Sequence, residues 1–306
     1  MYDLAIIGGG PAGVSAGIYA ARKHLKTIFI TETFGGQSVE SVGIENWIGT
    51  DKISGVDFAK MLEKHLRTSA EDTVEIKTGE RVMKVMRDGE TFSIETASAR
   101  YQAKTVLIAT GSTRRKLDIP GAKEYENKGL TYCASCDGPL FTGQDVVVIG
   151  GGNAGFESAA QLLNYAKSVT LLNRSDKFKA DETTVKKVLA HPKMTAIKGA
   201  VPIEIKGGKF VTGVVYKNAK AGEEKMISAS GVFVEIGLIP TTNFVEGLIE
   251  LNQYKQIPVD PKTQSTTMKG IWAAGDSTDG LYHQNNIAAG DAVKALENIY
   301  LYLHTK

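Results

Sequence analysis

An eleven-residue pattern that occurs twice is the feature that most limits how this chain can fold. Residues 3–13 read DLAIIGGGPAG and residues 145–155 read DVVVIGGGNAG, at an offset of 142 positions. Each copy is a short apolar strand that runs into G-x-G-x-x-G and then into a helical stretch, at 14–23 and 156–165. In that context the first glycine allows a tight turn, the second lets a pyrophosphate approach the backbone, and the third lets the helix pack on the strand. The repeat therefore predicts two dinucleotide-binding units rather than two incidental glycine turns.

Further apolar runs support the same interpretation. Residues 105–111 (TVLIATG) and 232–237 (VFVEIG) end in glycine, which is typical of buried parallel strands. Residues 74–104 alternate like an antiparallel meander, and so do residues 206–215 and 217–234. The expected fold class is α/β, with two Rossmann-like three-layer nucleotide-binding domains, the second inserted into the first, each with a small antiparallel β-meander.

The end of the chain indicates how the two units are connected. A strand that ends in glycine and acid (GIWAAGD, 270–276) and a helical apolar pattern from about residue 284 both lie beyond the second unit. The simplest account is one domain that another interrupts. We expect residues 1–114 and 243–306 to form one discontinuous domain and residues 115–242 to form the insert.

The strand after each glycine turn should present a residue to the adenosine ribose of a bound dinucleotide. In the first unit this residue is Glu32, whose carboxylate suits the ribose hydroxyls of FAD or NAD and repels a 2′-phosphate. In the second unit the same offset leads to Arg174, which could instead pair with a 2′-phosphate. Both residues could also be ordinary solvated charges at strand ends.

The chain has only two cysteines, Cys133 and Cys136, three positions apart. A structural zinc site needs four ligands at suitable spacings, and the five histidines of the sequence form no second ligand pair. An isolated C-x-x-C in a reducing compartment is typical of a working dithiol. The pair is therefore interpreted as redox-active, and no metal site is expected.

Bulk properties exclude several classes of function. A net charge of +2 is too small to indicate nucleic acid or an acidic membrane surface as a partner. The sequence has no run of 18 apolar residues, and its amino terminus has neither a basic region nor a small-residue cleavage site. We therefore expect a cytoplasmic protein.

Together these motifs resemble the low-molecular-weight thioredoxin reductases and the related C-terminal portion of the alkyl hydroperoxide reductase flavoprotein. The resemblance covers essentially the whole chain, and its most specific element is a cysteine pair followed by Asp-Gly inside the second nucleotide domain. The residues that carry it are Gly8-x-Gly10-x-x-Gly13, Gly35-Gly36-Gln37, Glu45-Asn46-Trp47, Ala109-Thr110-Gly111, Cys133-Ala134-Ser135-Cys136-Asp137-Gly138, Gly150 to Gly155 and Ala274-Gly275-Asp276.

The resemblance implies FAD in the discontinuous domain and NAD(P)H in the insert that carries the C-x-x-C. The cofactor-binding residues implied in the first domain are Gly8, Gly10, Pro11, Ala12, Gly13, Glu32, Gly36, Gln37, Asn46, Ala109, Thr110, Gly111, Gly275, Asp276, Gln284 and Ala288. Those implied in the insert are Gly150, Gly152, Asn153, Ala154, Gly155, Asn173 and Arg174. Relatives that use NADPH carry His-Arg-Arg where this chain has Asn173-Arg174-Ser175, and relatives that use NADH carry Glu at the Asn173 position. One arginine and no acid favour NADPH, with NADH left open.

The catalytic residues that the resemblance implies are Cys133, Cys136 and Asp137. Asp137 would move a proton to the departing thiolate, although Asp-Gly is also a common turn. Which cysteine meets the flavin and which attacks the partner stays open. The expected reaction passes electrons from NAD(P)H through FAD and the cysteine pair to a separate thioredoxin-like redoxin, and the resemblance also implies a homodimer. The alternatives are a reductase for a peroxiredoxin-linked redoxin, a dithiol oxidase or a flavin redox sensor.

Overall fold

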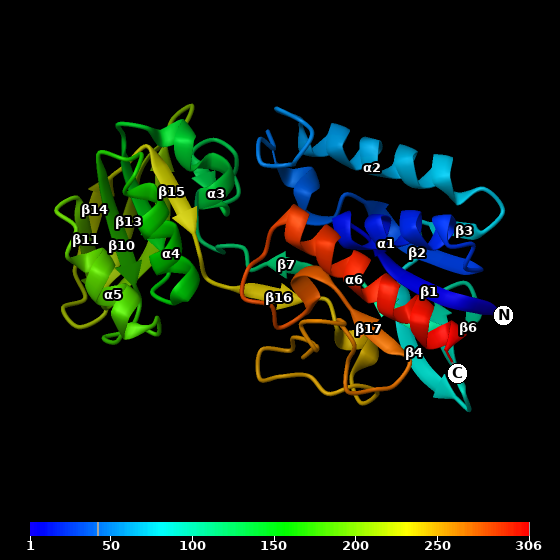
Figure 1. The fold of residues 1–306 in the computed structure, drawn as a ribbon. Helices are drawn as coiled ribbons and strands as arrows, with labels where there is room; N and C mark the ends of the chain where they lie inside the picture. Colours follow the sequence, from blue (N-terminus) through cyan, green and yellow to red (C-terminus); the bar gives the residue numbers. More distant parts are fainter. Residues whose placement is uncertain (42, 306) are drawn as a thin grey trace. The chain divides into compact units, whose positions relative to one another are not determined.

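A computed structural model describes residues 1–41 and 43–305. The chain divides into two compact units (Figure 1). Unit 1 comprises Met1–Thr113 and Ile239–Lys306, and unit 2 comprises Arg114–Leu238. The boundaries expected from the sequence lie after residue 114 and before residue 243. Strands β7 (Ser112–Arg114) and β16 (Leu238–Pro240) pair with each other where the chain passes between the units.

Unit 1 is built on one sheet in the order β3-β2-β1-β6-β5-β4, with β17 also paired to β6. Strands β1, β2, β3 and β17 run parallel to their neighbours, while β4, β5 and the start of β6 form an antiparallel meander. The strands are β1 (Tyr2–Gly9), β2 (Thr27–Phe34), β3 (Val74–Thr78), β4 (Val82–Asp88), β5 (Thr91–Thr96), β6 (Arg100–Ile108) and β17 (Ile271–Ala273). The helices are α1 (Pro11–Arg22), α2 (Gly55–Ala70) and α6 (Asn285–His304), with short 3-10 turns η1 (Gly36–Glu40), η3 (Asn243–Val245) and η4 (Gly275–Ser277).

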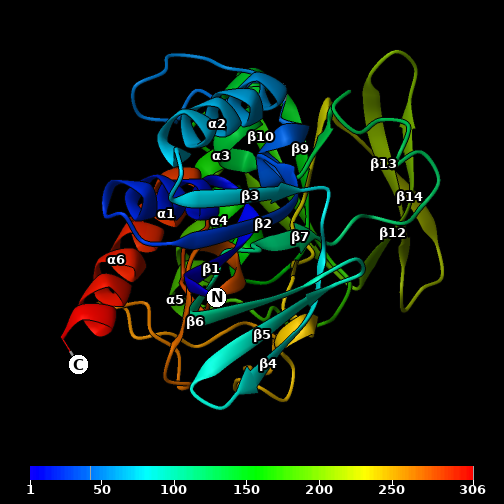
Figure 2. The same cartoon turned by 90° about the vertical axis from the view of Figure 1, so that its right-hand side faces the viewer.

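Alternate side chains of β1 lie on opposite faces of this sheet and belong to two different hydrophobic cores. Leu4 and Ile6 pack with α1, α2 and α6, whereas Ala5 and Ile7 pack with the meander and with the segment around Phe244. Figure 2 shows the three helices on one side of β1, β2 and β3. Segment 74–78 differs from the meander that the sequence suggests, because it joins β2 as a parallel strand in register with Thr27–Thr31.

Unit 2 has a parallel sheet in the order β11-β10-β9-β15-β8 and a separate antiparallel sheet in the order β12-β13-β14. The parallel strands are β8 (Leu130–Thr131), β9 (Asp145–Ile149), β10 (Ser168–Asn173), β11 (Met194–Lys198) and β15 (Gly231–Val234). The antiparallel strands are β12 (Ala200–Gly207), β13 (Val211–Asn218) and β14 (Glu224–Ser228). The helices are α3 (Ala134–Asp137), α4 (Asn153–Leu162) and α5 (Glu182–Leu189), and η2 (Gly138–Phe141) follows α3.

These elements of unit 2 form three layers. Val146 and Val148 of β9 pack with the helices, whereas Val147 and Ile149 pack with the antiparallel sheet. Figure 2 shows β12, β13 and β14 as a layer of their own beside β9 and β10. The expected fold class, with two parallel Rossmann-like sheets and small antiparallel sheets, is thus confirmed. Within the described residues, no helix has the length and apolar character needed to cross a membrane.

Candidate active site

The first glycine turn of unit 1 joins β1 to α1. Gly8 has a φ of +120°, and a Cβ there would lie 2.2 Å from the carbonyl oxygen of Ala109. A Cβ at Gly13 would lie 1.8 Å from the carbonyl oxygen of Gly8, whereas a Cβ at Gly10 would meet no heavy atom within 4 Å. Gly8 and Gly13 are therefore required by the packing of the protein itself. Gly10 instead leaves an open space at the amino terminus of α1, where backbone N–H groups lack a side-chain cap.

Other predicted residues of unit 1 converge on this turn from distant parts of the sequence. A Cβ built on Gly36 would lie 3.6 Å from the Cα of Gly10, and one built on Gly275 would lie 3.4 Å from the Cβ of Ala12 and 3.2 Å from that of Ala288. The turn between β1 and α1 is therefore bordered by the η1 and η4 turns and by the first turn of α6.

Polar side chains connect the same segments. Gln37 Nε2 donates to Ser112 Oγ at 3.2 Å and to Asp276 Oδ2 at 3.5 Å. Asn46 Nδ2 donates to Gln284 Oε1 at 3.1 Å. Four of the residues predicted to approach a flavin thus form two hydrogen-bonded pairs. His283 Nδ1 also lies 3.4 Å from Asp276 Oδ1.

Glu32 lies inside β2 rather than after it. The pairing of β1 with β2 shifts between Ile7 and Gly9, so β2 continues to Phe34. The Glu32 side chain is 58% exposed and its Oε2 lies 3.8 Å from Arg81 Nε. It is therefore accessible to a ligand.

The second glycine turn, between β9 and α4, repeats the first in detail. Gly150 has a φ of +135°, and a Cβ there would lie 2.0 Å from the carbonyl oxygen of Glu235. A Cβ at Gly155 would lie 2.0 Å from the carbonyl oxygen of Gly150, whereas a Cβ at Gly152 would meet nothing within 4 Å. Asn153 and Ala154 at the start of α4 are exposed. The middle glycine again marks open space at a helix amino terminus that no side chain caps.

Asn173 is the last residue of β10, beside this turn, and Arg174 follows it. Asn173 is buried, and its Nδ2 donates to the carbonyl oxygens of Ser175 at 2.7 Å and Lys177 at 3.0 Å. Its Oδ1 faces Gly151, where a Cβ would lie 2.3 Å away. The amide group of Asn173 therefore shapes the following loop, in which Arg174 is exposed.

Cys133 and Cys136 form a disulfide across the first turn of α3, with Cα atoms 5.3 Å apart. Cys133 caps this short helix, because its Sγ accepts a hydrogen bond from the Cys136 backbone N–H at 3.2 Å. Both cysteines are partly buried.

Asp137 is the next residue after the disulfide. Its carboxyl group accepts a hydrogen bond from the Thr131 hydroxyl group at the end of β8. Burial raises the pKa of Asp137, and the Thr131 hydrogen bond and the positive charge of Arg114 oppose that rise. The residue that follows the disulfide thus carries a carboxyl group with a raised pKa, a group suited to proton transfer to or from sulfur. Sequence motifs did not identify Thr131 or Arg114, which lie outside the C-x-x-C pattern.

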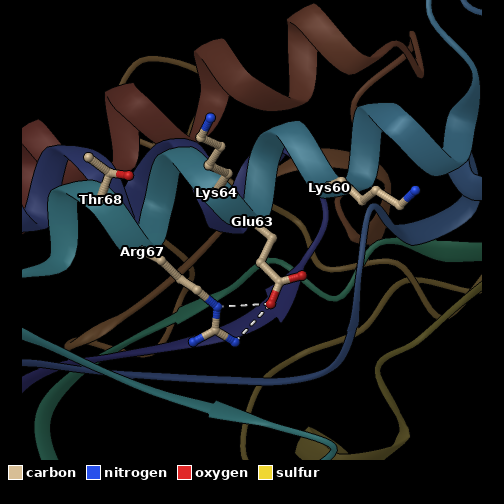
Figure 3. Close-up of a pocket in the computed structure, with 5 residues that line it drawn as sticks. All are labelled: Lys60, Glu63, Lys64, Arg67 and Thr68. Atoms are coloured by element: carbon tan, nitrogen blue, oxygen red, sulfur yellow. Dashed lines mark hydrogen bonds and ion pairs between the residues drawn. The ribbon is translucent and has the colours of Figure 1, made fainter.

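A separate surface hollow lies on α2 (Figure 3). Its lining residues all belong to this helix, and Glu63 Oε1 pairs with Arg67 Nη2 at 2.8 Å. None of the predicted site residues lines it; the lining residues are Lys60, Glu63, Lys64, Arg67 and Thr68. Within residues 1–41 and 43–305, no group of three or more His, Cys, Asp or Glu side chains is arranged to hold a metal ion.

Residues 2–292 match the family model described as pyridine nucleotide-disulphide oxidoreductase. The chain belongs to this family. Members of the pyridine nucleotide-disulphide oxidoreductase family use FAD and a pyridine nucleotide. The Cys133–Cys136 disulfide of this chain agrees with that membership.

Individual relatives agree with this assignment and with the resemblance found in the sequence. The chain is 40% identical over 303 residues to NADH dehydrogenase of Bacillus subtilis and 40% identical over 304 residues to the F component of alkyl hydroperoxide reductase of Escherichia coli. Each match covers 99% of this chain, which spans 58% of the length of either relative. Thioredoxin reductase of Streptococcus pyogenes superposes with a TM-score of 0.90 at 36% identity, covering 100% of this chain and 99% of that structure. That of Giardia duodenalis gives 0.92 at 35% identity, covering 99% and 98%.

Proposed function

We propose that this chain is an NAD(P)H-dependent reductase whose Cys133–Cys136 dithiol reduces the disulfide of a thioredoxin-like protein. The observation that carries the proposal is the disulfide beside Asp137, a carboxyl group whose pKa burial raises. The disulfide lies in the same unit as the second glycine turn. A thiol pair, a proton donor and a coenzyme turn are the parts that such a reaction requires.

The first glycine turn fits the diphosphate of FAD. Gly10 leaves open space where uncapped N–H groups of α1 point, and such a helix start favours an anion. When bound, FAD would supply two-electron chemistry between a pyridine nucleotide and a disulfide. The residues proposed to hold it are Gly8, Gly10, Pro11, Ala12, Gly13, Glu32, Gly36, Gln37, Asn46, Ala109, Thr110, Gly111, Gly275, Asp276, Gln284 and Ala288.

The second glycine turn fits the diphosphate of NADPH or NADH in the same way. Gly152 leaves the space, and Gly150 and Gly155 allow the close backbone approach around it. Asn153, Ala154 and Asn173 border the turn. The exposed Arg174 supports NADPH, because a guanidinium group can pair with a 2′-phosphate.

Disulfide exchange then proceeds through this chain's own cysteines. One thiolate of the reduced pair attacks a sulfur of the partner disulfide, which forms a mixed disulfide and releases one partner thiolate. The second cysteine attacks the mixed disulfide, which restores Cys133–Cys136 and releases the second partner thiolate. Asp137, whose pKa burial raises, would give a proton to a departing thiolate.

Purified protein that contains FAD tests the proposal. We expect rapid oxidation of NAD(P)H when an oxidised thioredoxin is added and slow oxidation without it. Cys133→Ser and Cys136→Ser should each abolish thioredoxin reduction, while NAD(P)H still bleaches the flavin absorbance. Near wild-type reduction of thioredoxin by either variant would rule out the dithiol relay.

A redoxin linked to a peroxiredoxin is the second candidate partner. The 40% identity to the F component of the Escherichia coli alkyl hydroperoxide reductase favours it. The same assay, run with a thioredoxin and with a glutaredoxin-like redoxin at equal concentration, separates the candidates by kcat/KM. We also propose a homodimer, which the molar mass from light scattering would test.

A further inference from the structure

Glu235 lies at the carboxyl end of β15, immediately beside the second glycine turn. In the sheet order β11-β10-β9-β15-β8, the chain continues from β9 to β10 on one side, whereas β15 lies on the other side of β9, so the order of strand addition reverses between β9 and β15. Open α/β sheets bind ligands at the carboxyl ends of the strands at such a reversal. The Glu235 backbone N–H donates to Ile149 at 2.8 Å, and its carbonyl oxygen packs against Gly150. Glu235 therefore borders the glycine turn at which we place the coenzyme.

The Glu235 side chain is directed towards the helix that begins at this turn. Its Oε1 accepts a hydrogen bond from Ser158 Oγ of α4 at 2.7 Å. Two charged groups act on the Glu235 carboxyl group: the exposed Glu157, which precedes Ser158 on α4, and Arg114 at the start of unit 2. Thr131 of the neighbouring strand β8 donates a hydrogen bond to Asp137. The buried Tyr216 of β13 belongs to the core between the parallel and antiparallel sheets.

Burial raises the pKa of Glu235 to about 7. The Ser158 hydrogen bond and the charge of Arg114 oppose the rise, and Glu157 adds to it. The group therefore changes charge near neutral pH, unlike an ordinary glutamate.

We propose that Glu235 couples coenzyme binding in unit 2 to the uptake of a proton. The inference rests on the proposed function, because it assumes a pyridine nucleotide at the second glycine turn. Its physical basis is charge: the coenzyme brings a negatively charged diphosphate to the glycine turn that Glu235 borders. An ionised Glu235 opposes this diphosphate, whereas a protonated Glu235 does not. Binding therefore favours the protonated acid, and by linkage the protonated acid favours binding.

The simpler role for Glu235 is mechanical, as a hydrogen-bonded connection between β15 and α4. Glu235→Gln separates the two roles, since glutamine can still accept from Ser158 but has no titratable proton. A purely mechanical Glu235 leaves the pH dependence of coenzyme affinity unchanged in this variant. Glu224→Gln is the matched control, because Glu224 is an exposed carboxylate of the same unit on β14.

The affinity of the FAD-containing protein for NAD⁺ is measured by titration calorimetry across neutral pH. NAD⁺ is the probe because its diphosphate does not change charge in this range and because it cannot reduce the flavin. In the wild type and in Glu224→Gln, Kd should rise by up to about tenfold between about pH 6 and about pH 8. In Glu235→Gln this rise should be absent. NADP⁺ is titrated in parallel, and the difference between wild type and variant is compared because its 2′-phosphate also titrates.

Proton uptake gives a second, direct readout. Calorimetry in two buffers of different ionisation enthalpy should detect proton uptake by the wild type slightly above pH 7 and none by Glu235→Gln. Ser158→Ala removes a hydrogen bond that lowers the pKa of Glu235, so its Kd should begin to rise at a higher pH than in the wild type. This variant serves as the test if Glu235→Gln fails to fold.

The outcomes separate this inference from the proposed function. If both coenzymes fail to bind at any pH, the proposed function is wrong and the inference falls with it. If a coenzyme binds with the same pH dependence and proton uptake in wild type and Glu235→Gln, the inference alone is overturned.

Discussion

The Thr131 hydroxyl group donates a hydrogen bond to the carboxyl group of Asp137, the residue that follows the redox disulfide. This bond stabilises the ionised form of the acid and so opposes the rise in pKa that burial causes. A single hydroxyl group thereby helps to set the pH at which Asp137 can donate a proton to sulfur.

Changing either residue should alter the pH profile of redoxin reduction. Asp137→Asn should lower kcat by about 10²-fold or more at neutral pH, a typical contribution of a general acid, while leaving flavin reduction by NAD(P)H intact. Thr131→Val should move the alkaline limb of the profile to higher pH, because loss of the hydrogen bond raises the pKa of Asp137 further. Steady-state rates across pH check both variants. A Thr131→Val profile that coincides with the wild type would contradict this role.

Gly10→Val should yield a folded protein that lacks FAD. A Cβ at Gly10 meets no protein atom within 4 Å, so the added side chain occupies only the space assigned to the diphosphate. Gly208→Val in the turn after β12 is the matched control, because its Cβ also meets nothing within 4 Å. The ratio of flavin to protein absorbance measures cofactor content, and far-UV circular dichroism measures folding. Stoichiometric flavin in Gly10→Val would refute the placement of the diphosphate.

Arg174→Ala should raise KM for NADPH and leave KM for NADH nearly unchanged. Loss of a charged hydrogen bond to the 2′-phosphate costs about 1–3 kcal/mol, or roughly 5- to 150-fold in affinity. Lys209→Ala removes an equal charge from the turn between β12 and β13 and should affect neither coenzyme. Equal changes for both coenzymes in Arg174→Ala, or none, would identify Arg174 as a solvated charge.

The pKa of Glu235 also predicts how stability depends on pH. The folded protein binds this proton up to about pH 7, whereas the unfolded chain releases it near the ordinary value of 4.5. The folded state therefore binds more protons between these values, and its free energy of unfolding falls as pH rises through that window. The full loss is at most about 3 kcal/mol. Urea unfolding without coenzyme, at about pH 5 and about pH 8, should show a smaller decrease for Glu235→Gln than for the wild type or Glu224→Gln.

Local patterns were enough to predict the layers and both glycine turns. Residues 146–149 form an unbroken apolar run, and the structure buries Val146 and Val148 on one face of the sheet and Val147 and Ile149 on the other. Such a run is typical of a strand buried on both faces, so it can be recognised without knowing the partners.

Residues whose importance depends on distant partners could not be predicted in this way. In the sequence, Glu235 is a single acidic residue in an apolar run. Only the fold brings it within hydrogen-bond distance of Ser158, 77 positions earlier. Thr131 belongs to no sequence motif, and its role depends on the hydrogen bond that its hydroxyl group donates to Asp137. The length of β2 beyond Glu32 likewise follows from a register shift against β1, which needs both strands in place.

The paired strands β7 and β16 bear on how the chain folds. On the unit 2 side of this pair, the Arg115 backbone N–H donates to the Gly237 carbonyl oxygen at 3.0 Å, and on the unit 1 side Thr241 donates to Gly111 at 3.0 Å. The first and last residues of unit 2 thus lie close together. Once unit 2 has folded, it therefore connects the two segments of unit 1 over a short distance. The entropy lost in closing a loop grows with its effective length, and a folded insert removes most of that length. Early folding of residues 114–238 would therefore ease the assembly of a sheet whose strands β6 and β17 are far apart in sequence.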